Sequence, residues 1–412
     1  MNPFFVPLVG QVTEGGIAQA EAAEKALSSH LFEIFILVLA TQVVGWIFQK
    51  IKQPVVIGEL LAGVIVGPAL LGWVVEGSLL EFIAELGAIF LLFMVGLETR
   101  MHDILKVGKE AFIVAVVGAI LPFFGGYYFG LYIGFNQVAS LFLGAALVAT
   151  SVGITARVMQ ELEVLSRPYS RIILGAAVID DIEGLIVLAI VSGIATTGAV
   201  ETAGIVRLVL ISFAFVGAAM ALVPFVRRIP LERLPFQSPL GVAIAFGMGM
   251  ATLASFIGLA PIVGAFMAGM VMAELREEHE LEPPIHAIES FLAPIFFAYM
   301  GVQLDLAALT SREVLIAGVV ISLIAIAGKL VSMFGALSQG LRQALVVGVG
   351  MVPRGEVGLI VASIGLSAGA VDEKEFAIVI FMVVVTTIIA PLSLRPLIAW
   401  ADPEVPLTEE AA

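Results

Sequence analysis

The sequence contains no cysteine, and only 13% of its 412 residues are charged. The absence of cysteine excludes disulfides, thiolate chemistry and cysteine-bound iron–sulfur clusters. The low charge excludes an ordinary soluble domain, in which about 25% of residues are charged. Basic residues are few, and the formal net charge of -14 argues against nucleic acid as a partner.

Long apolar runs take the place of the missing charge, because 60% of the residues are hydrophobic and the mean hydropathy is +1.10. Runs of about 18 or more apolar residues are typical of membrane-spanning helices, and these runs lack the alternation of transmembrane strands. The sequence therefore predicts an all-α polytopic membrane protein with about 13 transmembrane helices. The candidate spans are residues 31–49, 54–72, 79–97, 111–133, 137–160, 169–197, 202–226, 237–257, 260–275, 285–304, 311–337, 339–366 and 374–399.

The lysines and arginines of the short loops indicate an orientation. About fourteen of them fall in one set of alternate loops and about four in the other, and the richer set is expected on the cytoplasmic side. This predicts a multi-pass protein of the cell (inner) membrane with its N-terminus outside and its C-terminus in the cytoplasm. The first 30 residues are polar and do not resemble a signal peptide.

Two of the spans are interrupted in the middle. Span 137–160 contains Thr-Ser-Val-Gly, and span 339–366 contains Gly350, Pro353 and Gly355, which weaken a helix. Interrupted spans at corresponding positions of two halves point to a transporter binding site. If the fourth to sixth spans correspond to the eleventh to thirteenth, the offset is odd and the two copies are inverted repeats.

Among the charged residues inside spans, those expected to face the cost of the bilayer centre are Asp180, Asp181, Lys329, Arg354 and Glu356. Each costs about 2.5–3.5 kcal/mol at the bilayer centre, so each should face protein or water and have a partner. For Arg354 and Glu356, a structural polar network that ties a broken helix to its neighbours is the simple interpretation. Adjacent carboxylates repel each other, so Asp180 and Asp181 make a poor structural device and a good candidate site.

Neighbouring residues of a helix point about 100° apart, so Asp180 and Asp181 address different partners. Lys329, the only lysine in the interior of a span, is the natural counter-ion of one of them. The other is left for a mobile cation. Carboxylates, the hydroxyls of Thr150 and Ser151, and freed backbone carbonyls are suitable ligands for Na+.

Two further acids have weaker signals. Glu183, one turn beyond Asp180, either lines an aqueous funnel or pairs with a loop arginine. Glu59 lies near the cytoplasmic end of its span, where solvation of the helix end is the simple interpretation and a regulatory role is the alternative. The histidines are too scattered for a metal site, and no cofactor motif or catalytic triad is visible, so we expect no enzyme and no catalytic residue.

Six stretches resemble the bacterial Na+/H+ antiporters of the monovalent cation:proton antiporter superfamily, in the order that the family has them. They are "GELLAGVIVGP", "LGAIFLLFMVGLE", "ATSVGITARVM", "GAAVIDDIEGLIVLAIV", "GKLVSMFG" and "GVGMVPRGEVGLIVA". The resemblance implies that Asp181 is the shared site of Na+ and H+, and that Asp180 pairs with Lys329. Thr150 and Ser151 match the polar break of the first crossing helix, whereas Glu183 stands where an apolar residue is expected.

The resemblance also implies an organisation into a scaffold and a mobile core. The implied ranges are 1–30 (N-terminal tail), 31–110 and 236–310 (scaffold or dimer domain), 111–200 and 311–400 (core ion-transport domain), 201–235 (linking helix) and 401–412 (cytoplasmic tail). The expected partners are Na+, H+, the lipid bilayer and a second copy in a homodimer, with no cofactor beyond the transported ions.

Charge counting leaves the stoichiometry open. If Na+ binds both carboxylates and Lys329 loses its proton, two protons exchange for one Na+; if Lys329 stays protonated, exchange is one for one. The resemblance favours the first, electrogenic version, because its electrogenic members carry two adjacent acids. Alternatives are Li+ as a second substrate, a K+/H+ antiporter, a Na+-coupled solute symporter of similar fold, and a channel.

Overall fold

The structure is a computed structural model that describes residues 14–226, 238–275, 280–304 and 311–404. Within these ranges all regular elements are helices, as the hydropathy predicts. The side chains of residues 14–26 and of Glu356 lie outside the description. So do residues 1–13 and 405–412 of the two predicted tails and residues 227–235 of the predicted linking helix. The interpretation of Glu356 therefore stays a prediction.

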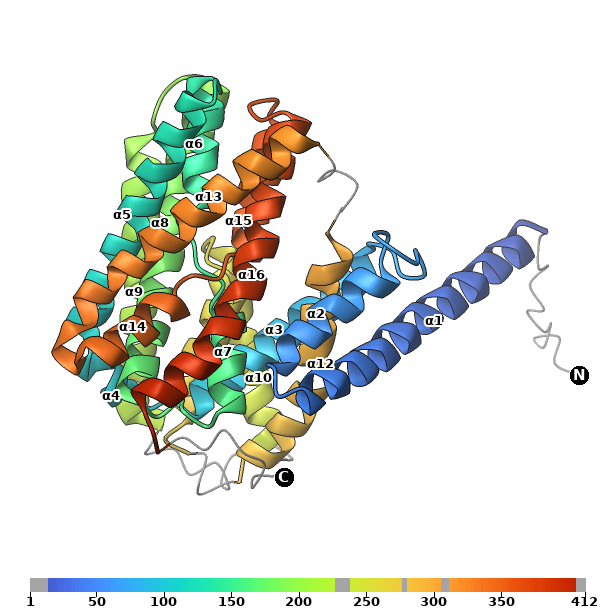
Figure 1. Cartoon of the computed structure of the whole chain (residues 1–412). Helices are drawn as coiled ribbons and strands as arrows, with labels where there is room; N and C mark the ends of the chain where they lie inside the picture. Colours follow the sequence, from blue (N-terminus) through green and yellow to red (C-terminus); the bar gives the residue numbers. More distant parts are fainter. Residues whose placement is uncertain (1–13, 227–237, 276–279, 305–310, 405–412) are drawn as a thin grey trace, which may run out of the picture.

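The described chain folds into a succession of helices (Figure 1). They are α1 (Glu14–Lys50), α2 (Val55–Val66), α3 (Ser78–Leu97), α4 (Met101–Lys106), α5 (Gly108–Tyr132), α6 (Gln137–Ala146), α7 (Val152–Glu161), α8 (Pro168–Thr197), α9 (Thr202–Val226), α10 (Pro239–Phe256), α11 (Pro261–Met272), α12 (Glu282–Val302), α13 (Arg312–Leu330), the 3₁₀ helix η3 (Val331–Gln339), α14 (Leu341–Gly350), α15 (Glu356–Ser367) and α16 (Glu373–Ala401). In the described ranges, eight helical segments are long and apolar enough to cross a membrane.

The predicted spans correspond to these helices, which confirms the all-α polytopic architecture. The two interrupted spans are each a pair of short helices, α6 with α7 and α14 with α15. One boundary differs, because α1 begins at Glu14 and not near residue 31. The segment that it adds is rich in alanine and glutamate, which favour helix without being apolar, so hydropathy does not detect it.

The helices pack as two groups. In the first group, α3 packs on α11 and α12, and α2 packs on α1 and α12. In the second group, α5 packs on α6, α8 and α13, and α16 packs on α13, α14 and α15. The second group contains the inverted repeat: α5, α6/α7 and α8 correspond to α13/η3, α14/α15 and α16, and the two broken helices run in opposite directions (Figure 1).

Close packing in the first group depends on glycine. A Cβ on Gly63 of α2 would lie 1.8 Å from the carbonyl oxygen of Ala298 in α12, and one on Gly301 of α12 would lie 2.1 Å from that of Leu60 in α2. Small residues let helix backbones approach closely in a membrane, where van der Waals packing replaces the hydrophobic effect between helices. The α2–α12 contact is therefore made by backbone against backbone.

We expect Gly63→Ala to destabilise the protein by about 1–3 kcal/mol, the usual cost of overpacking a tight contact. Gly249→Ala is the matched control, because Gly249 lies inside α10 and nothing lies within 4 Å of an added Cβ. Thermal unfolding in detergent would measure both variants. Equal unfolding midpoints for Gly63→Ala and Gly249→Ala would show that α2 and α12 can move apart at this contact without a loss of stability.

A short helix connects the two groups on one side. Asp103 of α4 contacts Lys106 Nζ at 2.9 Å and Arg171 Nη2, in the first turn of α8, also at 2.9 Å. The hydrogen bond from Lys106 lowers the pKa of Asp103 below its usual value, and the positive charge of Arg171 acts in the same direction. Asp103 thus fixes the α3–α5 connection to the start of the helix that carries Asp180 and Asp181.

Candidate ion site

The two broken helices meet at their breaks. The backbone N–H of Ser151 donates to the carbonyl of Pro353 at 2.9 Å, and the hydroxyl of Thr155 donates to the carbonyl of Gly350 at 2.7 Å. Two helices end here, α6 and α14, and two begin, α7 and α15. The crossing therefore collects partial charges of both signs in the middle of the second group.

Arg354 lies in the break that follows α14. Its Nη1 donates to the carbonyls of Met351 and Val352, each at 3.2 Å, and its side chain is fully buried. These carbonyls follow directly after α14, where a positive charge is favourable. Thr386 and Thr387 of α16 bind the backbone of Arg354 at 3.3 and 2.6 Å. Arg354 thus connects the residues of the break to one another through its side chain, and connects the break to α16 through its backbone.

The structure brings Asp180 and Lys329 together. Nζ of Lys329 lies 2.6 Å from Oδ2 of Asp180, and both side chains are 0% exposed. The hydroxyl of Thr150 donates to the same Oδ2 at 2.5 Å and also lies 3.2 Å from the carbonyl of Met351. Oδ1 of Asp180 has no hydrogen-bond partner among the described residues. One carboxylate oxygen therefore binds the lysine and the first break, and the other remains available.

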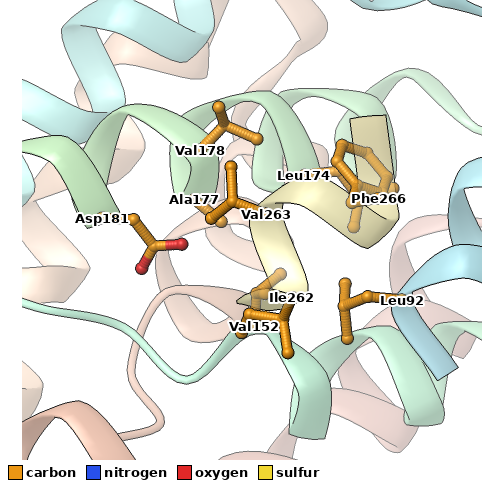
Figure 2. Close-up of a pocket in the computed structure, with 9 residues that line it drawn as sticks. All are labelled: Leu92, Val152, Leu174, Ala177, Val178, Asp181, Ile262, Val263 and Phe266. Atoms are coloured by element: carbon orange, nitrogen blue, oxygen red, sulfur yellow. The ribbon is translucent and has the colours of Figure 1, made fainter. Parts of the chain in front are cut away.

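Asp181 points in a different direction from Asp180. Its side chain is 8% exposed and lines a pocket between the two groups, with a cavity volume of about 10 Å³, enough for roughly one water (Figure 2). Its other lining residues are apolar: Leu92, Val152, Leu174, Ala177, Val178, Ile262, Val263 and Phe266. Asp181 is thus the acid on the seam between the groups, and Asp180 is the acid inside the second group.

A second, larger cavity of about 760 Å³ lies between α3, α11 and α12 of the first group and α15 of the second. Glu81, Glu85, Gln303 and Ser363 are among its polar lining residues. Ile262 lines both cavities, so the larger cavity and the pocket at Asp181 meet the same residue of α11.

The remaining predicted residues lie around this centre. Ser151 is buried in the crossing, and its hydroxyl lies so close to Gly355 that a Cβ there would come within 2.6 Å of it. Glu183 lies about 200° round α8 from Asp181, so it cannot share the seam. It lines neither cavity, and its Oε2 is buried without a hydrogen-bond partner in the described part of the chain.

Glu59 lies away from the crossing, and its expected solvation at a helix end is wrong. It is 2% exposed, and its Oε1 lies 3.6 Å from Nη2 of Arg157 in α7. Arg157 also contacts Glu289 of α12 at 2.8 Å and Glu161 at 3.7 Å. This cluster was not predicted from the sequence, because Arg157 lies near the end of its span and was counted as a loop cation, and Glu289 is a single acid just before the apolar run "FLAPIFFAYM".

Comparison with known proteins places the whole arrangement among transporters. Residues 36–400 match the profile described as sodium/hydrogen exchanger, transmembrane. The chain is 34% identical to the high-affinity Na(+)/H(+) antiporter NhaS3 of Synechocystis, over 98% of this chain and 97% of that protein. It is 33% identical to the Na(+)/H(+)-K(+) antiporter GerN of Bacillus cereus, over 88% and 95% of the two chains.

The fold is also similar to a solved structure. The sodium proton antiporter MjNhaP1 of Methanocaldococcus jannaschii aligns with a TM-score of 0.64, covering 93% of this chain and 100% of that one. The sequence identity over this alignment is 17%, so the likeness concerns the fold alone.

Proposed function

Because the chain belongs to the transmembrane sodium/hydrogen exchanger family, we propose that it exchanges Na+ for H+ across the membrane by alternating access, with Asp181 as the shared site. The observation that supports this proposal is that two adjacent acids have different surroundings. Asp180 is held by Lys329 and Thr150, whereas Asp181 lines the seam between two helix groups. A carboxylate there binds either a proton or a cation, and the two compete.

The proposed Na+ ligands surround Asp181 and the free oxygen of Asp180. Oδ1 of Asp180 lacks a hydrogen-bond partner in the described structure, and Thr150 and Ser151 add hydroxyl oxygens at the crossing. Hard monovalent cations take such oxygen ligands, and broken helices supply them in transporters. Li+, which prefers the same ligands, is a further proposed substrate.

The buried lysine makes electrogenic exchange the favoured version. Proton-loaded, with Asp181 neutral, the three charges of Asp180, Asp181 and Lys329 sum to zero. If Na+ displaces Lys329 from Asp180 and the lysine loses its proton, the total charge of the Na+-loaded site is minus one. Two protons then move for each Na+. Burial disfavours an ammonium ion that has lost its counter-ion, which supports this version over one-for-one exchange.

The two helix groups supply the moving parts in this proposal. The first group corresponds to the proposed scaffold, through which two copies would form a homodimer, and the second to the proposed core. With the N-terminus outside, the larger cavity opens to the extracytoplasmic side and the Arg157 cluster lies towards the cytoplasm. Alternating access then means that the core shifts along the seam until Asp181 faces the other side.

A K+/H+ antiporter is the second candidate, because the relative GerN is named a Na(+)/H(+)-K(+) antiporter. Purified protein in liposomes would decide between the ions. We expect a Na+ gradient to drive proton movement, and an imposed membrane potential to change its rate. Equal or greater flux with K+ would favour the second candidate, and no flux with Na+, Li+ or K+ would reject the exchange.

A further inference from the structure

The cluster around Arg157 joins the two helix groups at one end of the seam. Arg157 belongs to α7 of the second group, and its two closest partners across the seam belong to the first: Glu289 of α12 at 2.8 Å and Glu59 of α2 at 3.6 Å. The carboxylates are 0% and 2% exposed, and the arginine side chain is 15% exposed. The ion pairs of Arg157 with Glu289 and Glu59 therefore connect the second group to the first across the seam.

The cluster and the larger cavity occupy opposite ends of the same seam. Glu289 lies in the first half of α12, whereas Gln303, at the far end of that helix, lines the cavity. Fourteen residues of helix separate them, which is about 21 Å. In this structure, one end of the seam is therefore hollow, and the other holds the buried carboxylates that contact Arg157.

Arg157 is mechanically connected to the ion site. It lies on α7, which begins at Val152, and Val152 lines the pocket of Asp181. The residue before it, Ser151, is bonded to the second break at Pro353. A displacement of the crossing relative to α2 and α12 must therefore move Arg157 away from its two partners.

We propose that Arg157, with Glu289 and Glu59, is the closing contact of the transport pathway on the side opposite the large cavity. The inference rests on the proposed alternating access and adds the residues that hold one of its two states. The contact is strong enough to hold, because breaking a buried pair leaves an uncompensated charge. It is also releasable, because Oε2 of Glu59 and Oε2 of Glu289 make no hydrogen bond in the described structure, and the contact of Glu289 Oε2 with His286 Nε2 is long, at 4.0 Å.

The absence of cysteine from the sequence allows a direct test by single-cysteine labelling. Ser363→Cys reports the large cavity, which Ser363 lines. Gln160→Cys reports the closed end, because Gln160 lies one turn beyond Arg157 on α7 and its amide atoms are buried. Each reporter is placed in nanodiscs, where both membrane faces are accessible, and reacts with a hydrophilic maleimide. No ion gradient is present, so the readout does not depend on transport.

Glu289→Gln removes the charge of the closer partner and keeps its shape. We expect labelling at position 363 to slow several-fold and labelling at position 160 to accelerate several-fold, because the population shifts to the state open at the other end. Glu289→Asp, which keeps the carboxylate, should stay near the unmodified reporters. Glu313→Gln is the control, because Glu313 pairs with Lys374 on the exposed surface within the second group.

Two results would overturn the proposal. Unchanged labelling rates at positions 363 and 160 would show that the contact does not set the populations of the two states. Faster labelling at both positions would show that the protein has become less rigid without a change in these populations. If Glu289→Gln does not yield folded protein, Glu59→Gln tests the same contact from the other partner. A failure of Na+/H+ exchange by the unmodified chain in liposomes would reject the proposed function separately, since labelling is read without transport.

Discussion

Replacing Asp181 by asparagine should remove Na+/H+ exchange. The change keeps the size of the side chain but removes the carboxylate that we propose for both ions. Loss of even an indirect partner of a bound metal ion typically costs about 10–100-fold in affinity, so loss of a direct carboxylate ligand should cost more than about 100-fold. Na+-driven proton flux in liposomes and Na+ binding by calorimetry at several pH values would both measure the effect.

The fold should survive this substitution. Asparagine has the size of aspartate, and the ion pair of Asp180 with Lys329 stays intact. Thermal unfolding of Asp181→Asn should therefore resemble that of Glu313→Gln, a control acid on the exposed surface that should retain exchange. Exchange by Asp181→Asn at close to the rate of the unmodified protein would show that Asp181 is not the shared site of Na+ and H+.

The features predictable from the sequence are those that the membrane dictates locally. A span must be apolar along its length, so hydropathy finds it without knowledge of its neighbours. The breaks are equally local, because Pro353, Gly355 and the polar Thr150 and Ser151 disrupt helix wherever they occur. A contact of Lys329 with one of the two adjacent acids was also predictable, since a lone buried lysine needs an acid and few acids lie inside spans. The choice of Asp180, 149 residues away, came from the resemblance to the antiporter family.

The partners of Arg157, in contrast, could not be predicted from the sequence. An arginine near the end of a span has two satisfactory environments, the aqueous interface and a buried acid, and both leave the same sequence pattern. The choice depends on where α2 and α12 lie relative to α7, and the contact of Gly63 with Ala298 fixes only α2 and α12 to each other. The position of α12 relative to α7 brings Glu289 to Arg157 from 132 residues away.

The role of Glu183 stays a prediction. Its position one turn beyond Asp180 suggested either an aqueous funnel or a pairing with a loop arginine. The period of the helix puts it about 200° from Asp181, on the side of α8 away from the seam. It lines neither of the two cavities described above. Its distance along the chain from Asp180 therefore says less about its surroundings than the period of the helix does.

The pair of Asp180 and Lys329 gives the second large expected effect. Removing one partner leaves the other as a buried, uncompensated charge, which typically costs about 3–5 kcal/mol. We therefore expect Lys329→Met and Asp180→Asn each to lower the thermal unfolding midpoint in detergent sharply. In the double variant both charges are gone, and replacing a buried ion pair by neutral groups is often close to neutral.

The double variant should thus recover most of the stability that either single variant loses, and a double-mutant cycle would give a coupling of several kcal/mol. Exchange should not return, because the amide that replaces the carboxylate of Asp180 offers a single carbonyl oxygen and no charge. Losses that simply add in the double variant would show that the two side chains do not depend on each other. Recovered exchange would show that the charge of this pair serves only the fold, and the electrogenic version would lose its second proton carrier.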